Sequence, residues 1–104
     1  MIFHIDRQQD KSVIVIDKNN IVGPETGGIQ NAVLDLVENQ AKTILLDLSK
    51  VNYISSYGIG MLMYAYTTCT KRNVEFYLTG VNEKVLKILE IVNLNKIFII
   101  KDNI

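Results

Sequence analysis

The chain has 104 residues, 48% of them hydrophobic and 21% charged, so we expect one compact domain over residues 1–104. Lysine plus arginine and aspartate plus glutamate both number 11, which leaves no net positive charge to attract nucleic acid or an anionic membrane. No apolar run approaches the roughly 18 residues that span a bilayer, and the amino terminus lacks the layout of a secretion signal. A single cysteine, Cys69, excludes an internal disulfide and is expected to be a packing residue. These features predict a soluble cytoplasmic protein.

The amino-terminal part of the chain has the pattern of a β-hairpin. Residues 3–6 alternate between apolar and polar side chains, and residues 13–16 form a run of β-branched side chains. The polar residues between the two runs indicate a turn. An irregular connection follows, marked by Asn20, Gly23 and Pro24.

Two helices and a buried strand are predicted in the middle of the chain. Apolar residues recur at helical spacing from about Glu25 to Asn39, which indicates an amphipathic helix. Residues 43–48 form a nearly continuous apolar run, which is typical of a strand covered on both faces. A second helical pattern follows Ser55 and continues to about Arg72, a basic residue that suits the negative end of a helix dipole.

The carboxyl-terminal part adds two strands and one helix. Residues 75–80 and 97–100 have the composition of strands, and Asn82 between them is a good amino-terminal cap for a third helix. The predicted order is therefore β-β-α-β-α-β-α-β. This order indicates an α/β fold with a mixed central β-sheet, in which a hairpin leads into parallel crossovers and the helices pack against the sheet. The apolar stripe expected on the third helix consists of Val85, Leu86, Leu89 and Val92.

The usual catalytic and metal-binding constellations are missing from the sequence. One histidine, His4, and one cysteine do not make a typical zinc site, and nothing near His4 in the sequence would orient it as a base. Gly23, Gly27 and Gly28 resemble a phosphate-binding loop superficially, but Pro24 interrupts them and no lysine follows. Asp47 ends a strand, as a phosphoacceptor aspartate does, but the acidic pair and the lysine of that chemistry are absent. We therefore expect Asp47 to fix the loop toward Ser49, and we expect no metal and no cofactor.

The segment from Ser55 to Gly60 stands out as the start of the second helix. Serines are good amino-terminal caps because the hydroxyl accepts from a backbone N–H that has no partner within the helix. Gly58 and Gly60 each cost roughly 1 kcal/mol relative to alanine in an exposed helix, so local stability does not select them. Small residues leave a low surface that another protein can approach, and a serine there is presentable to a kinase. On physics alone, a plain capping and packing role is equally open.

Residues 47–62 resemble the signature of STAS domains. That family's usual form is Asp-Leu-Ser, a few residues, then Ile-Asp-Ser-Ser/Thr-Gly-Leu-Gly and a helix. The chain here has Asp-Leu-Ser at residues 47–49 and Ile-Ser-Ser-Tyr-Gly-Ile-Gly at residues 54–60. Residues 85–98 also resemble the family's third helix and its turn into the last strand. The resemblance covers roughly residues 3–102 and implies a single STAS-like domain.

The resemblance also implies a function. In the bacterial regulators of this family, the serine after the motif's aspartate is phosphorylated by a serine kinase of the GHKL ATPase type, which doubles as an anti-sigma factor. A PP2C-type phosphatase reverses the modification. The matching position here is Ser56, which is favoured over Ser55. The resemblance thus implies a non-enzymatic anti-sigma factor antagonist that switches partners when it is phosphorylated.

Two departures from the family pattern keep other interpretations open. Ser55 stands where the family has aspartate, and Tyr57 stands where it has serine or threonine. One alternative is a STAS adaptor module that is never phosphorylated, or that binds a nucleotide or a lipid. Another is an enzyme or receiver that uses Asp47. A dimer through the helix face near Met61 and Tyr64 is also open. The expected partner surface consists of Ser55, Ser56, Tyr57, Gly58, Ile59 and Gly60, with Asn20 and Gly23 from the earlier loop.

Overall fold

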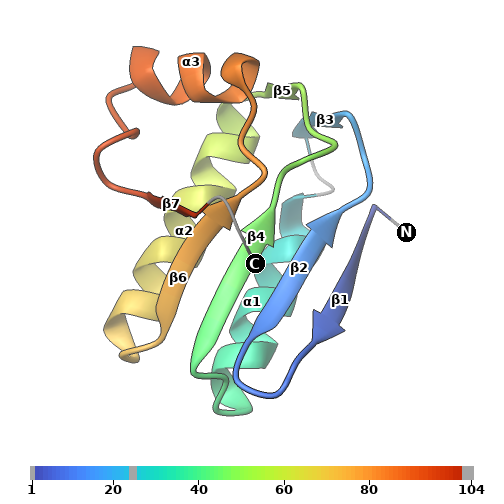
Figure 1. Cartoon of the computed structure of the whole chain (residues 1–104), viewed down its shortest axis with the longest axis vertical. Helices are drawn as coiled ribbons and strands as arrows, with labels where there is room; N and C mark the ends of the chain where they lie inside the picture. Colours follow the sequence, from blue (N-terminus) through green and yellow to red (C-terminus); the bar gives the residue numbers. More distant parts are fainter. Residues whose placement is uncertain (1, 24–25, 102–104) are drawn as a thin grey trace.

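The computed structural model describes residues 2–23 and 26–101, and the predicted alternation of strands and helices is present in it (Figure 1). Pro24 and the expected start of the first helix at Glu25 lie outside these residues. The elements are β1 (Phe3–Arg7), β2 (Ser12–Ile16), β3 (Asn20–Ile21), α1 (Thr26–Glu38), β4 (Thr43–Asp47), β5 (Tyr53–Ile54), α2 (Ser56–Lys71), β6 (Glu75–Thr79), α3 (Glu83–Ile91) and β7 (Ile99–Lys101).

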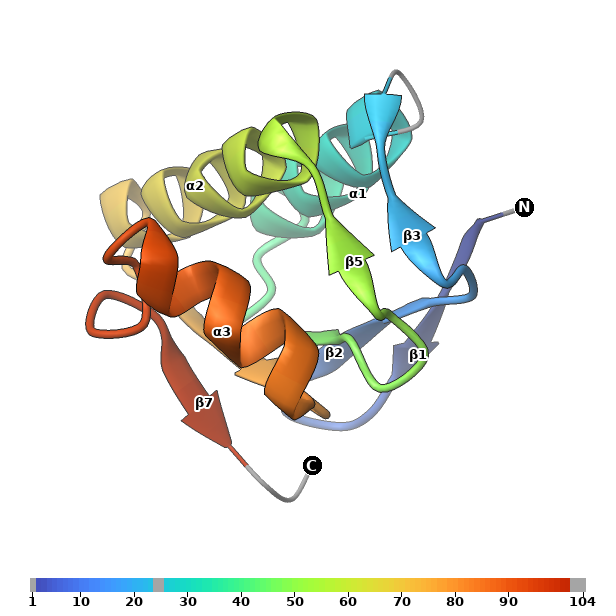
Figure 2. The ribbon, with the colours of Figure 1, turned by 90° about the horizontal axis from the view of Figure 1, so that it is seen from above.

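Five of the strands form a mixed sheet in the order β1-β2-β4-β6-β7, which confirms the predicted fold class. β1 pairs with β2 as an antiparallel hairpin, and every other neighbouring pair is parallel. The central strand β4 is buried on both faces at Ile44, Leu45 and Leu46, as its continuous apolar run predicts. Helices α1 and α2 pack against each other and cover one face of the sheet (Figure 2).

The main core lies between this helix pair and the sheet. Cys69 is buried there as a packing residue, and burial raises the pKa of its thiol to about 11. Met61 is fully buried in the same layer and Tyr64 is half-buried. Met61 is therefore not available for the suggested dimer contact, because the apolar side of α2 packs into the protein's own core.

The last helix and strand differ from the sequence prediction. Helix α3 ends at Ile91, and Val92 is its carboxyl-terminal cap and is exposed. Val85 and Leu89 of the predicted stripe are buried, whereas Leu86 is half-buried. β7 begins at Ile99, two residues later than predicted. Phe98 instead turns inward, and its ring makes edge contacts with the rings of Tyr66 and Phe76, at centroid distances of 5.8 and 6.4 Å.

A second, two-stranded sheet was not predicted from the sequence. β3 and β5 pair in parallel with only two residues each, and neither has the length that gives a strand a recognisable pattern. In the view from above, this small sheet lies beyond the ends of the parallel strands, next to the start of α2 and beside α3 (Figure 2). It therefore forms part of the surroundings of the candidate site.

Candidate functional site

The small sheet brings together two segments that lie about thirty residues apart in the sequence. Asn20 is the register partner of Tyr53, and Ile21 is the partner of Ile54. The backbone N–H of Ser55 then donates to the carbonyl of Ile21 at 3.0 Å, which extends the contact to the start of α2. Strand β3, which contains Asn20, thus lies beside the start of the Ser55–Gly60 segment, although no local pattern in the sequence predicts this pairing.

Ser55 caps helix α2. Its backbone is extended, with φ −83° and ψ −178°, and its hydroxyl oxygen accepts from the backbone N–H of Tyr57 at 3.2 Å. Its carbonyl accepts the first backbone hydrogen bond of the helix, from Ile59 at 2.9 Å. Ser55 is half-buried. This serine therefore has the structural role that its position predicts, and its oxygen is already used.

Ser56 and Tyr57, the first two residues of α2, are exposed. The Tyr57 side chain is 64% accessible, which is a large apolar area to leave in water at one point of the surface. No acidic residue lies in the first turn of the helix. The positive end of the helix dipole and the N–H groups around Ser56 are therefore not balanced by a carboxylate within that turn.

Gly58 has a different role from the one we expected. It is buried, and a Cβ atom placed on it would lie 2.3 Å from Cγ2 of Ile54 and 3.0 Å from the carbonyl oxygen of Ile21. The missing side chain therefore lets β3 and β5 approach the first turn of α2, and it does not offer a bare surface to a partner. The expectation that Gly58 contributes directly to the partner surface is corrected on this point.

Gly60 fits the expectation of an open surface. It is exposed, and a Cβ atom placed on it would have nothing within 4 Å. Ile59, between the two glycines, is half-buried and packs against the core. The first turns of α2 therefore combine an inward glycine, which the fold requires, with an outward glycine, for which the monomer gives no steric reason.

Gly23 stands where the chain leaves β3 for α1. Its φ of +75° lies in the left-handed region, which glycine adopts without the strain that a side chain would add. Its carbonyl accepts from the hydroxyl of Thr26 at 3.1 Å, so it helps to fix the start of α1. Gly23 is half-buried, and its predicted contribution to a partner surface remains untested.

Asp47 has the structural role that the sequence favoured. Its Oδ1 atom accepts from the backbone N–H of Ser49 at 2.9 Å, which fixes the turn after β4. Gly80, with φ +68°, lies against this turn, and a Cβ atom there would approach the Ser49 nitrogen to 2.8 Å and Asp47 Oδ1 to 2.9 Å. The Asp47 carboxylate therefore has a structural partner in the Ser49 backbone and is enclosed by Gly80.

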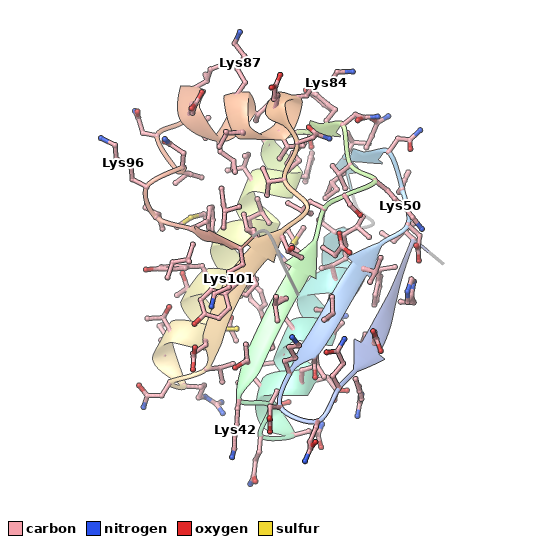
Figure 3. The ribbon with its side chains drawn as sticks, viewed as in Figure 1. Lys42, Lys50, Lys84, Lys87, Lys96 and Lys101 are labelled. Atoms are coloured by element: carbon pink, nitrogen blue, oxygen red, sulfur yellow. The ribbon has the colours of Figure 1, made fainter. Side chains whose placement is uncertain are left out.

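One polar cluster was missed by the sequence reasoning. Asp17 accepts from Lys50 at 2.9 Å through one carboxylate oxygen and contacts the His4 ring through the other. The bond from Lys50, and then that from His4, lower the pKa of Asp17 below its ordinary value. The expectation that nothing orients His4 is therefore wrong, because Asp17 is 13 residues away in sequence but adjacent across the hairpin. Lys50 lies at the same end of the sheet as α3 (Figure 3).

Among residues 2–23 and 26–101, no group of three or more histidine, cysteine, aspartate and glutamate side chains is placed to hold a metal ion. In the same ranges, no helix is both long enough and apolar enough to cross a lipid bilayer.

Comparison with known proteins identifies the class to which this fold and its helix start belong. The model of the STAS domain family matches residues 4–104, and the chain belongs to that family. Among curated proteins, the anti-sigma-B factor antagonist of Listeria monocytogenes is 32% identical over 57 residues. That match covers 55% of this chain and 50% of the relative, so the chain spans about half the length of the curated relatives it matches.

Solved structures of the same fold extend the comparison to the whole chain. A candidate anti-sigma factor antagonist from Thermotoga maritima superposes with a TM-score of 0.81 at 27% identity, covering 98% of this chain and 87% of that one. The phosphorylated form of SpoIIAA from Bacillus, a cell fate determinant, superposes with a TM-score of 0.76 at 13% identity, covering 98% and 91%. The latter likeness establishes the fold alone.

Proposed function

We propose that this protein is an anti-sigma factor antagonist that binds an anti-sigma serine kinase and is switched off by phosphorylation at Ser56. The kinase is of the GHKL ATPase type and supplies the ATP chemistry, so the STAS domain itself is not an enzyme. A PP2C-type phosphatase restores the unphosphorylated form. The switch operates in the cytoplasm, where such a kinase and its sigma factor meet.

The observation that carries the proposal is the contrast between the two serines at the start of α2. Ser55 is half-buried, and its hydroxyl oxygen is used as the helix cap. Ser56 is exposed one residue later. A kinase that modified Ser55 would have to break the cap first, whereas modification of Ser56 leaves the cap in place. This supports Ser56 as the acceptor.

A phosphate on Ser56 is compatible with the fold. It adds about −1.5 to −2 charge at neutral pH beside the positive end of the helix dipole, where N–H groups are available to it. The first turn of α2 contains no carboxylate that would repel the added charge. The modified protein is therefore expected to stay folded, which a reversible switch requires.

The same phosphate changes how the surface binds a partner. Tyr57 is exposed beside it, and Gly60 leaves room for close approach of another chain one turn further on. A partner that covers this surface must remove water from the phosphate or match its charge. A difference of 1.4 kcal/mol already changes an affinity tenfold, so one phosphate is sufficient for a switch.

Tyr57 also supports a second candidate function. A large exposed aromatic side chain next to Ser56 is typical of a protein interface, and it adds bulk where the family has a small residue. The domain would then be a constitutive STAS adaptor in a signalling complex, and Ser56 would not be modified.

The first experiment measures phosphorylation and binding together. Wild-type protein, Ser56→Ala, Ser55→Ala and Ser56→Asp are incubated with ATP and with the anti-sigma kinase isolated from the native cells. We expect phosphate on wild type and on Ser55→Ala, and none on Ser56→Ala. Calorimetry of the same kinase should give at least about tenfold weaker binding to Ser56→Asp than to Ser56→Ala.

The controls separate the two candidates. Circular dichroism establishes that all four proteins are equally folded, so a loss of binding is not a loss of structure. If the kinase binds every variant equally and modifies none, the switch is refuted and the adaptor function stands. If phosphate appears on Ser55 in the wild type, partner switching survives but the acceptor is wrong.

A further inference from the structure

The outer edge of β1 is an open sheet edge in the described part of the chain. β1 is the first strand of the five-stranded sheet, and among the described residues it pairs with β2 alone. Natural sheets protect such an edge with charged side chains, lysine above all, with proline, or with a bulge. β1 has the sequence Phe-His-Ile-Asp-Arg, which contains no lysine and no proline, and its register with β2 is uninterrupted. Its Asp6 and Arg7 side chains are charged and exposed, so only an edge that accommodates these charges can pair with it.

The hydrogen-bond ladder defines which backbone groups of β1 point outward. The backbone N–H of Asp17 donates to the Ile2 carbonyl, and the backbone N–H of Gln8 donates to the Lys11 carbonyl, so the backbone groups of the even-numbered residues of β1 face β2. In an antiparallel pair these positions alternate along the strand. The N–H and C=O groups of Phe3, Ile5 and Arg7 are therefore directed away from the sheet, in position to pair with another strand.

The side chains of β1 are divided between the two faces of the sheet. Phe3 lies on the helix side, 3.5 Å from the position of a Cβ atom on Gly28 in α1, and Ile5 packs against the core on the same side. His4 and Asp6 project from the opposite face, because side chains alternate along a strand. Both are exposed.

From this arrangement we infer that β1 pairs with β1 of a second copy of this chain, antiparallel and across a two-fold axis at Ile5. The axis places Ile5 opposite Ile5 of the second copy, in a hydrogen-bonded pair. Phe3 of each copy then lies opposite Arg7 of the other copy. His4 then stands opposite Asp6 of the second copy, twice, in the non-hydrogen-bonded positions where side chains approach most closely. The edge is thus complementary to itself in backbone and in charge.

The charge pattern explains why this edge fits a second copy. Opposite charges placed across from each other on paired strands attract, and like charges repel. The two-fold copy of β1 presents a carboxylate to each histidine. Asp17 on the neighbouring strand already contacts His4 and orients the ring. The resulting dimer has one continuous ten-stranded sheet, and its two α2 starts lie at opposite ends because the strands of the two copies run in opposite directions.

The charge pairs are tested by mixing variants. Asp6→Lys places a lysine opposite His4, and His4→Glu places two carboxylates opposite each other, so each variant alone should dimerise about tenfold more weakly than wild type. An equal mixture of the two variants restores both attractive pairs in the heterodimer. Sedimentation equilibrium of the mixture should recover an affinity within about threefold of wild type.

The backbone pairing is tested by a proline. Arg7→Pro removes an N–H that points away from β2, so the hairpin keeps its own ladder and the monomer should remain folded. The dimer loses two of its backbone bonds. Arg7→Ala is the matched control, since it removes the same side chain and keeps the N–H. We expect Arg7→Pro to dimerise at least about tenfold more weakly than Arg7→Ala.

Three outcomes would overturn the inference. Wild-type protein that remains monomeric at its highest soluble concentration would exclude the pairing. A dimer that Arg7→Pro leaves unchanged would use another surface, such as the exposed apolar side chains of α3 and β7. A mixture that dimerises no better than its two components would show that His4 and Asp6 do not face each other. None of these results bears on the role of Ser56, which lies outside the pairing edge.

Discussion

The starts of helices α2 and α3 use the same local device for different ends. Ser55 and Asn82 are both extended caps whose side-chain oxygen accepts a backbone N–H of the first turn. Asn82 also donates to the carbonyl of Val51 at 2.7 Å, so it joins α3 to the loop before β5. Ser55 has a single cap bond, at 3.2 Å. The Asn82 side chain thus holds the start of α3 at two points and the Ser55 side chain holds that of α2 at one, although the Ser55 backbone N–H also bonds to the Ile21 carbonyl.

The residues after the caps continue the contrast. The first helical residue is the exposed Ser56 in α2 and the exposed acidic Glu83 in α3. The third is buried in both helices, as Gly58 and as Val85. In α3 the first turn has a charge that suits the helix dipole and a side chain in the core. In α2 both contributions are missing, so the first turn is less stabilised at the place where the proposed switch adds a negative charge.

The largest effect should come from removing the two caps. Asn82→Ala loses the cap and the bond to Val51, at about 1 kcal/mol each, so the free energy of unfolding should fall by about 2 kcal/mol. Ser55→Ala should cost about 0.5–1 kcal/mol, because it loses the cap alone. Urea denaturation measures both. Equal losses would mean that the second anchor of α3 adds nothing.

The two glycines of α2 should respond to alanine with opposite signs. Gly58→Ala forces its new methyl group against Ile54 and Ile21, and we expect a loss of about 1 kcal/mol or more after the gain in helix propensity is included. Gly60→Ala meets open space and should gain up to about 1 kcal/mol. Thermal unfolding of both variants gives the signs.

The Gly60→Ala variant also tests the partner surface. If a partner approaches the backbone at this point, the more stable variant should bind it less tightly. Unchanged affinity would remove Gly60 from the proposed surface, and a destabilised Gly60→Ala would contradict the open space found around it.

The smallest effect concerns charge at the first helical residue. Ser56→Asp should stabilise the protein by about 0.3–1 kcal/mol at low ionic strength, and Glu83→Gln should destabilise it by a similar amount. Both effects should shrink in high salt. The control for the first change is Ser56→Asn, which has the same shape without the charge. A Ser56→Asp protein less stable than Ser56→Asn would show that this helix start disfavours negative charge.

Local patterns were sufficient for most of the fold. The helical spacing of α1, the continuous apolar run of β4 and the cap at Asn82 each predict an element that the structure contains. These elements are long enough for periodicity to be visible, or are marked by residues with strong positional preferences. The start of α2 was placed correctly for the same reason, since serines followed by glycines mark an unusual helix start, whereas the partner and phosphorylation sites assigned to it stay predictions.

Contacts distant in sequence could not be predicted in this way. β3 and β5 are too short to show a period, and the side-chain contacts of Asp17 with His4 and Lys50 join residues 13 and 33 positions away. The start of β7 was placed too early because Phe98 is as apolar as a strand residue, although its ring turns into the core against Tyr66.

The sequence by itself determined the order of the elements, the caps of α2 and α3, and the position of an exposed serine at a helix start. These properties depend on neighbouring residues and on backbone preferences that each residue carries with it. The tertiary structure alone decided that Gly58 belongs to the interior and Gly60 to the surface. The two glycines are chemically identical and two residues apart, and they differ only because β3 and β5 pass within van der Waals distance of one and not of the other.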